Sequence, residues 1–307
     1  KAPLLRGFFI ICSKLYIIMG DLYALLTAVC WSSAVILFDL SSNKLNPLQI
    51  NIVKNSLGVI GFIITIFILN IPCPNFSNKS LIILIISGII GVGVADLLFL
   101  DSLNKIGSSF SAIVATIYAP SVFIIAYIFF GEIITLNVYI GTILILGGII
   151  VSTYNSPRLI SSQRLVTGVF YGALAQILTA LSVLSVKPIM VDNPILYVAL
   201  IRFGMGLFIG LVFLILKSGP SEVIVTFRIG ISNTFMLLGA FFGTYLSVIL
   251  WLSGYKYTLS GKAAIYNQLS TVLISIMAVI FLKEKLTNKK KIGIVLSFFG
   301  AVFVSLD

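Results

Sequence analysis

Three ionisable side chains lie inside apolar stretches of the chain. Asp96 lies about five residues inside the end of one stretch, Lys54 one turn inside the start of another, and Arg202 two turns inside a third. An ionised side chain in the middle of a membrane span costs at least about 2.5–3.5 kcal/mol, and such residues mark substrate or proton pathways. A buried carboxyl group can carry a proton, and an arginine fork can bond both oxygens of a carboxylate or phosphate. These residues are therefore candidates for solute binding or proton coupling.

Structural roles for these charges remain open. The breaks before Lys54 and after Asp96 open on the same face of the membrane, so the two side chains lie at similar depth and can pair. Arg202 enters from the opposite face and can instead bond carbonyl groups at a helix end. Glu132 and Glu284 end their apolar runs at the membrane surface, which favours a turn or capping role over solute contact.

Aromatic rings and amides make up a second group of candidates. Aromatic walls with a few polar groups suit a small organic ligand, although each residue can also serve packing or an interfacial belt. The sequence has no His, and its three Cys lack metal-like spacing, so we predict no metal site, no cofactor and no enzymatic activity. The candidates of this group are Trp31, Tyr118, Gln176, Trp251, Tyr266, Asn267 and Gln268.

The composition places these candidates in a lipid bilayer. The chain is 59% hydrophobic and 9% charged, against about 25% charged in ordinary globular chains. Its net charge of +11 comes from Lys and Arg at the ends of apolar runs, which indicates contact with lipid headgroups and argues against nucleic acid as a partner. We predict an all-α integral membrane protein.

Apolar runs long enough to span a bilayer recur along the chain, and a span needs about 20 residues. Pro120 falls in the middle of the fourth run and is expected to bend that helix. The polar breaks between the runs are too short to hold a soluble domain. The ten predicted spans are Leu22–Leu40, Ile50–Ile71, Leu81–Ser102, Phe110–Phe130, Leu136–Thr153, Val166–Val186, Ile195–Leu216, Ile231–Leu252, Ala263–Leu282 and Ile292–Leu306.

The two halves of the chain repeat each other. Ser109–Gly148 returns as Gly261–Gly300 with matching residue spacings, and Lys54 returns as Arg202 in an earlier part of the repeat. Five spans per half is an odd number, so the second half enters the membrane upside down. Inverted repeats are typical of secondary transporters, which bind solute near the midplane between the repeats.

The repeat also defines the predicted domains. Residues 1–19 form an N-terminal extension or interfacial segment, with a signal-like segment as the alternative. Residues 20–154 form the first five-helix repeat, residues 155–165 the linker, and residues 166–307 the second repeat.

Several short motifs, taken in order, resemble the EamA domain of the drug/metabolite transporter superfamily. The resemblance covers both repeats, and it implies a ten-helix carrier that works by alternating access on small organic solutes, often as an exporter. The positive-inside rule puts both termini outside the cell, whereas the resemblance implies cytosolic termini. The motifs are Ala28-x-x-Trp31, Pro47 followed by Lys54, the run from Asp96 to Leu103, Pro120 and the Gly131-Glu132 turn.

From these features we predict a secondary-active exporter or exchanger of small organic metabolites such as amino acids, located in the cell membrane. Protons are the candidate coupling ion, and both a monomer and a homodimer are compatible with the sequence. A carrier of nucleotide-linked or lipid-linked sugars is the alternative, and it should show additional basic residues in its cavity. An intramembrane enzyme or a receptor without transport is a less favoured alternative.

Overall fold

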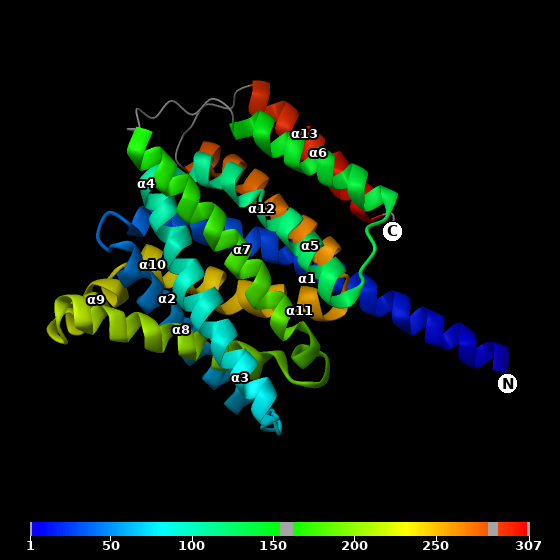
Figure 1. The fold of residues 1–307 in the computed structure, drawn as a ribbon, viewed down its shortest axis with the longest axis horizontal. Coiled ribbons are helices and arrows are strands. Elements are labelled where there is room, and N and C mark those ends of the chain that lie inside the picture. Colours follow the sequence, from blue (N-terminus) through cyan, green and yellow to red (C-terminus); the bar gives the residue numbers. More distant parts are fainter. Residues whose placement is uncertain (1, 154–161, 282–287, 306–307) are drawn as a thin grey trace.

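The computed structural model describes residues 2–153, 162–281 and 288–305, and these segments are helical with short connections (Figure 1). The first half contains α1 (Ala2–Ser41), α2 (Pro47–Ile68), α3 (Asn78–Ser87), the π-helix η1 (Gly88–Ala95), α4 (Asp96–Ala115), α5 (Tyr118–Phe130) and α6 (Leu136–Thr153). The second half contains α7 (Ser162–Asp192), α8 (Ile195–Ser218), α9 (Ser221–Ser232), α10 (Thr234–Ala240), the π-helix η2 (Phe241–Leu246), α11 (Ser247–Tyr257), α12 (Ser260–Phe281) and α13 (Asn288–Ser305).

Local sequence explains where the helices begin and end. Asn46 and Gln49 form a capping box in which each side chain accepts a bond from the other's backbone N–H, and Pro47 occupies the first turn of α2. At the end of α5, Gly131 has a φ of 63°, a left-handed conformation that glycine adopts without strain.

Six helical segments are long and apolar enough to cross a membrane: Ile18–Ser41, Pro47–Ile68, Asn78–Ile106, Gln163–Asp192, Ile195–Ser218 and Thr234–Tyr257. They are the first three spans predicted for each half. Tyr118–Phe130, Leu136–Gly148 and Lys291–Gly300 are apolar but shorter. The repeated helical architecture agrees with the prediction, whereas the number of ten transmembrane helices is not confirmed.

The course of the chain differs from the prediction at three places. The helix α4 continues through residues 103–109, where the sequence suggested a break, and the chain turns at Thr116 and Ile117 instead. Pro120 therefore lies in the first turn of α5, where its missing N–H removes no helical bond, and it does not bend a span from within. The short helix α9 was not predicted, and α7 begins at Ser162, inside the predicted linker.

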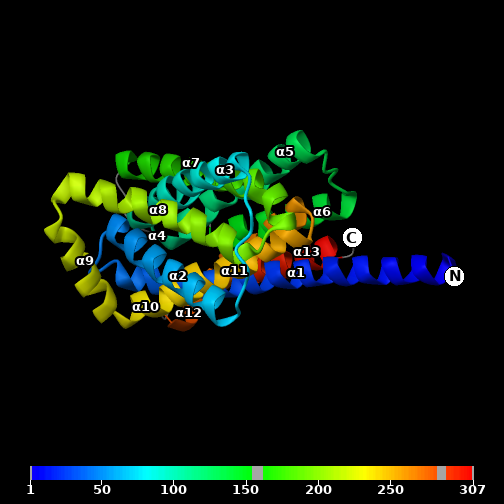
Figure 2. The same ribbon diagram turned by 90° about the horizontal axis from the view of Figure 1, so that it is seen from below.

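The N-terminal segment continues α1 as one helix that projects beyond the bundle (Figures 1 and 2). Residues 2–19 therefore share a helix with the first span.

The halves pack against each other in matched pairs. The helix α1 contacts α11 and α12, while its counterpart α7 contacts α4 and α5. The helix α2 packs on its own counterpart α8, and α6 packs along α13, as the parallel green and red helices show (Figure 1). This pattern indicates a pseudo-twofold axis between the halves.

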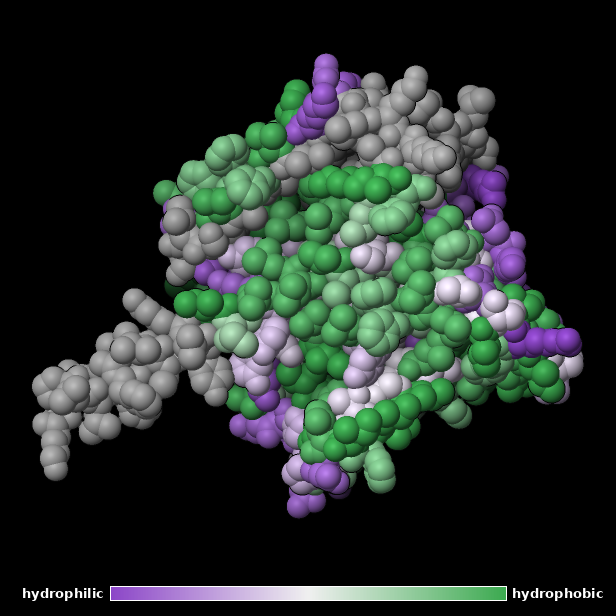
Figure 3. All heavy atoms as spheres, turned by 180° about the vertical axis from the view of Figure 1, so that it is seen from behind, coloured by the Kyte–Doolittle hydropathy of each residue, from purple (hydrophilic) through white to green (hydrophobic). Residues whose placement is uncertain are grey.

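The outer surface is apolar. Phe67, Ile133 and Leu216 are each at least 80% exposed. In the view from behind, a broad hydrophobic band crosses the molecule and polar residues gather near its edges (Figure 3). Such a surface suits lipid, because soluble monomers rarely expose apolar patches of this extent.

Candidate functional site

A cavity of about 170 Å³ lies between the two halves. Its lining on α1 runs from Thr27 to Val35, in the middle of the Ile18–Ser41 span, so the cavity lies at mid-depth. Eight of the ten predicted site residues line it, and both halves contribute. These eight are Trp31, Lys54, Asp96, Tyr118, Gln176, Trp251, Asn267 and Gln268.

Lys54 and Asp96 form an ion pair at this cavity, which confirms that the two can pair. The Lys54 ammonium lies 2.5 Å from Asp96 Oδ2 and also donates to Asn55 Oδ1 at 3.0 Å. The Lys54 side chain is 2% exposed, whereas that of Asp96 is 23% exposed. Both residues line the cavity, and the carboxylate is the more exposed end of the pair.

The π-helix η1 ends immediately before Asp96. A π-helix disturbs the regular bonding of helical carbonyl groups and is frequent at functional sites. Here Asn51 Nδ2 donates to the carbonyls of Val92 and Gly93 at 3.3 and 3.4 Å, and Asn51 Oδ1 accepts a bond from Asn55. A continuous chain of polar contacts thus connects the Lys54–Asp96 pair with the backbone of η1.

Arg202, the counterpart of Lys54, lies outside the cavity lining. Its Nη2 donates to Ser182 Oγ at 2.8 Å, and its guanidinium lies 5.6 Å from the ring centroid of Trp251, which does line the cavity. The side chain is 1% exposed, and its Nε and Nη1 have no partner among the described residues. Direct binding of an anionic solute by Arg202 stays a prediction, and the cavity lining does not include its side chain.

Close packing of η1 holds this region together. The Ser87 hydroxyl donates to the carbonyl of Ser182, and the Ser182 hydroxyl lies 2.9 Å from the carbonyl of Ser87. A Cβ atom on Gly91 would lie 2.0 Å from Ser182 Oγ, so this position requires glycine. The contact brings η1 and α7 into direct apposition beside Arg202.

Aromatic side chains form much of the cavity wall. The rings of Trp31 and Phe99 lie 6.0 Å apart, and the Tyr118 and Tyr255 hydroxyls are bonded at 2.6 Å. Tyr266 is 1% exposed and is not part of the lining, so its predicted role in solute contact has no direct geometric support.

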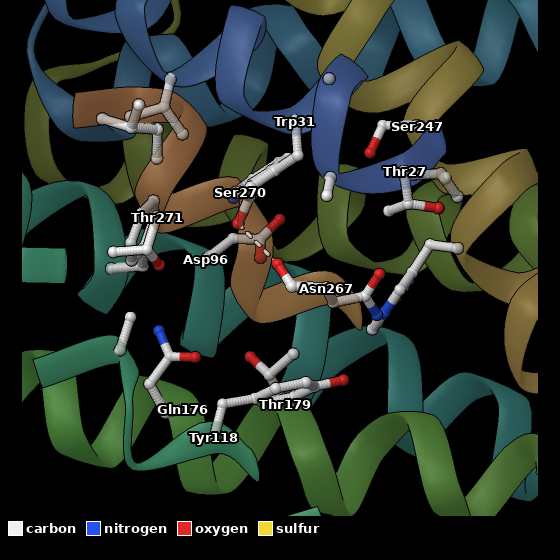
Figure 4. A pocket seen from close by; sticks show the side chains of 18 of the residues that line it. Thr27, Trp31, Asp96, Tyr118, Gln176, Thr179, Ser247, Asn267, Ser270 and Thr271 are labelled. Carbon is white, nitrogen blue, oxygen red and sulfur yellow. Dashed lines mark hydrogen bonds between the residues drawn. The ribbon is translucent and has the colours of Figure 1, made fainter. Parts of the chain in front are cut away.

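The amides differ in how they are bonded. Gln268 Nε2 donates to the carbonyl of Ala115 at 2.8 Å and thereby joins α12 to α4. The Asn267 amide lines the cavity, and neither its Oδ1 nor its Nδ2 has a partner among the described residues. In Figure 4, Asp96, Ser270 and Asn267 are grouped in the centre of the view, with Gln176, Tyr118 and Thr179 below them.

A second group of polar residues joins the halves at the membrane face where α12 begins. The Lys187 ammonium lies 2.8 Å from Glu132 Oε1 and 2.6 Å from the Ser260 hydroxyl, and Glu132 Oε2 accepts the Ser260 backbone N–H at 2.9 Å. The Thr258 hydroxyl nearby donates to Asp21 at 2.8 Å. We call Asp21, Glu132, Lys187, Thr258 and Ser260 the Glu132 cluster.

The Glu132 cluster agrees with a capping role for Glu132, although the capped helix is α12 and not its own. Glu284, for which the same role was predicted, lies outside the described residues.

Several lining residues were not among the sequence candidates. Thr179 and Ser270 are two of them, and they stand at the repeat positions of Trp31 and Tyr118. Ser247 is a third, and it follows η2 directly as Asp96 follows η1. Applying the repeat offsets to Trp31 and Tyr118 would have found Thr179 and Ser270. The described residues hold no group of three or more His, Cys, Asp or Glu side chains suited to a metal.

Comparison with known proteins gives three findings. The sequence model of the EamA-like transporter family matches residues 18–154 and 166–306. An uncharacterized transporter of Archaeoglobus fulgidus is 23% identical over 273 residues, covering 89% of this chain and 93% of the relative. A crystal structure shares the fold with a TM-score of 0.73 and 14% identity, covering 94% of this chain and 98% of the other.

Proposed function

Because this chain belongs to the EamA-like transporter family, we propose that it is a secondary-active carrier that exports or exchanges small organic metabolites, such as amino acids, across the cell membrane. The family and the transporter relative point to transport and not to catalysis. The observation that carries the finer proposal is the mid-depth cavity, which both halves line and which contains an ion pair.

Alternating access needs two halves that can separate at one face and then at the other. The Glu132 cluster supports this mechanism, because it joins the halves at a single face through an ion pair and hydrogen bonds. Such contacts can break and re-form, whereas extensive apolar packing resists separation. In our proposal the halves rock about the cavity, and the Glu132 cluster holds one face closed.

The nucleotide-sugar alternative is less well supported. A pyrophosphate needs cationic partners, and Lys54 is already paired with Asp96. Arg202 lies behind Trp251 and outside the lining. A carrier of solutes without net negative charge fits these positions better.

Counterflow in proteoliposomes tests the proposal. The vesicles are loaded with one unlabelled compound from a panel of amino acids, amines, sugars, nucleosides and nucleotide sugars, and uptake of the labelled compound is followed. We expect saturable counterflow with small metabolites and none with nucleotide sugars. Counterflow of nucleotide sugars alone would overturn the proposal in favour of the alternative.

The coupling role of Asp96 is tested with Asp96→Asn and the control Asp101→Asn. Both carboxylates lie on α4, but Asp101 pairs with Lys105 at 2.7 Å outside the cavity lining. Asp96→Asn should lose accumulation driven by a pH gradient while counterflow persists at saturating solute concentration, and Asp101→Asn should retain both. Normal accumulation by Asp96→Asn would refute proton coupling at this residue.

A further inference from the structure

The hydrogen-bonding groups of the cavity point to the kind of solute that it binds. We infer that the cavity recognises the primary ammonium group of its solute, and that a carboxylate on the solute is not required. This inference rests on the proposed function and narrows its substrate class from small metabolites in general to amines and amino compounds.

The first support is the direction in which three of the lining hydroxyl groups are already bonded. The hydroxyls of Thr27, Thr179 and Ser270 donate to backbone carbonyls on their own helices, at 2.7, 2.8 and 2.7 Å. A hydroxyl group that has used its proton retains lone pairs and can only accept a further bond. These oxygens therefore suit a solute that donates several hydrogen bonds, as an ammonium group does.

The second support is the position of the formal charges. Asp96 is 23% exposed and contributes a carboxylate to the cavity, whereas its partner Lys54 is 2% exposed. Arg202 is 1% exposed and lies behind Trp251. The most exposed formal charge that a solute meets in the cavity is therefore the Asp96 carboxylate, which favours a cationic group and disfavours an anionic one.

The third support is the Asn267 amide, whose two polar atoms are buried at the cavity and have no partner among the residues that the structure describes. A buried polar group without a partner costs about 1–3 kcal/mol, so a ligand that bonds it recovers this free energy. Asn267 Oδ1 can accept an N–H from the solute ammonium, and its Nδ2 can donate to an acceptor elsewhere on the solute. The aromatic rings of the lining add attraction, because a cation is attracted to the face of an aromatic ring.

Three compounds that share a phenyl ring test the ammonium and the carboxylate of the solute separately. Phenylethylamine carries the ammonium alone, 3-phenylpropionate carries the carboxylate alone, and phenylalanine carries both. Binding is measured by quenching of tryptophan fluorescence in purified protein, since Trp31 and Trp251 line the cavity. Competition with counterflow is measured separately in proteoliposomes.

We expect phenylethylamine and phenylalanine to bind and to compete, and 3-phenylpropionate to do neither. Asp96→Asn should weaken phenylethylamine binding about tenfold or more, because a charge-assisted bond is lost and Lys54 is left to repel the ligand. The control Asp101→Asn should bind as the wild type does.

Asn267→Ala provides a second test that leaves the ion pair intact, and it should weaken the same ligand several-fold. Binding of 3-phenylpropionate without phenylethylamine would overturn the inference, as would the absence of binding by all three compounds. Amine binding without any counterflow would leave the inference standing and instead refute the transport proposal.

Discussion

Replacement of Lys187 by Met should open the membrane face that the Glu132 cluster holds closed. In the structure, Lys187 bonds Glu132 Oε1 at 2.8 Å and the Ser260 hydroxyl at 2.6 Å, and the Lys187 and Glu132 side chains are 16% and 15% exposed. A hydrogen bond to a charged group contributes about 1.5–3 kcal/mol. If the substitution destabilises the closed state by about 2 kcal/mol relative to the open state, the population of the open state rises about thirtyfold.

The assay follows the access of a reagent to the cavity from that face. Thr27 lines the cavity on α1, six residues after Asp21 of the Glu132 cluster. Thr27→Cys is introduced into a chain from which the three native cysteines have been removed, and oriented sealed vesicles are treated with a membrane-impermeant maleimide. We expect Lys187→Met to increase the labelling rate by up to about thirtyfold when the reagent is added at the Glu132 face.

A matched control is Lys105→Met, which removes the ion pair between Lys105 and Asp101 outside the Glu132 cluster. It should leave the labelling rate unchanged. Equal rates for Lys187→Met and its parent would show that the Glu132 cluster does not hold this face closed. The reasoning would also fail if Lys105→Met accelerated labelling as much as Lys187→Met.

Two further predictions concern the packing and charge around η1. Gly91→Ala should lower the thermal unfolding temperature in detergent, because its Cβ would lie 2.0 Å from Ser182 Oγ. The control Gly147→Ala has open space around its Cβ and should leave the unfolding temperature unchanged. Equal effects of the two substitutions would contradict this account. Lys54→Met should destabilise the protein more than the double variant Lys54→Met/Asp96→Asn, because the single change leaves a carboxylate without its buried partner. A double variant that is less stable than the single variant would argue against this explanation.

The ion pair could be predicted from sequence because a charge inside an apolar span must find a partner. The repeat fixed the direction of each span, and the depths of Lys54 and Asp96 then followed from residue counting. The same counting placed Arg202 two turns inside its span, but it could not show that the side chain packs near the Trp251 ring and outside the cavity lining. Depth depends on position along the helix, whereas orientation around the helix depends on tertiary packing.

Other features lay beyond sequence patterns for physical reasons. The polar stretch at residues 103–109 suggested a loop, yet the chain there is helical, and the Ser102 hydroxyl just before it bonds the Gly168 carbonyl of α7. The π-helices η1 and η2 arise from a change in backbone bonding, which the periodicity of side chains does not report. The partners of Glu132 come from α7 and from the beginning of α12, distant in sequence, so a helix-end role could be predicted but not its contacts.

The two π-helices set the rotational phase of the residues that follow them. In a regular helix each residue turns the chain by about 100°, so one additional residue in a turn rotates every later side chain by that angle. Asp96 and Ser247 stand immediately after η1 and η2, and both reach the cavity. The direction in which the Asp96 and Ser247 side chains point is therefore set by the number of residues in η1 and in η2. Substitutions within η1 or η2 can preserve that phase, whereas the loss of a single residue would turn the carboxylate of one half, or the hydroxyl of the other, away from the solute.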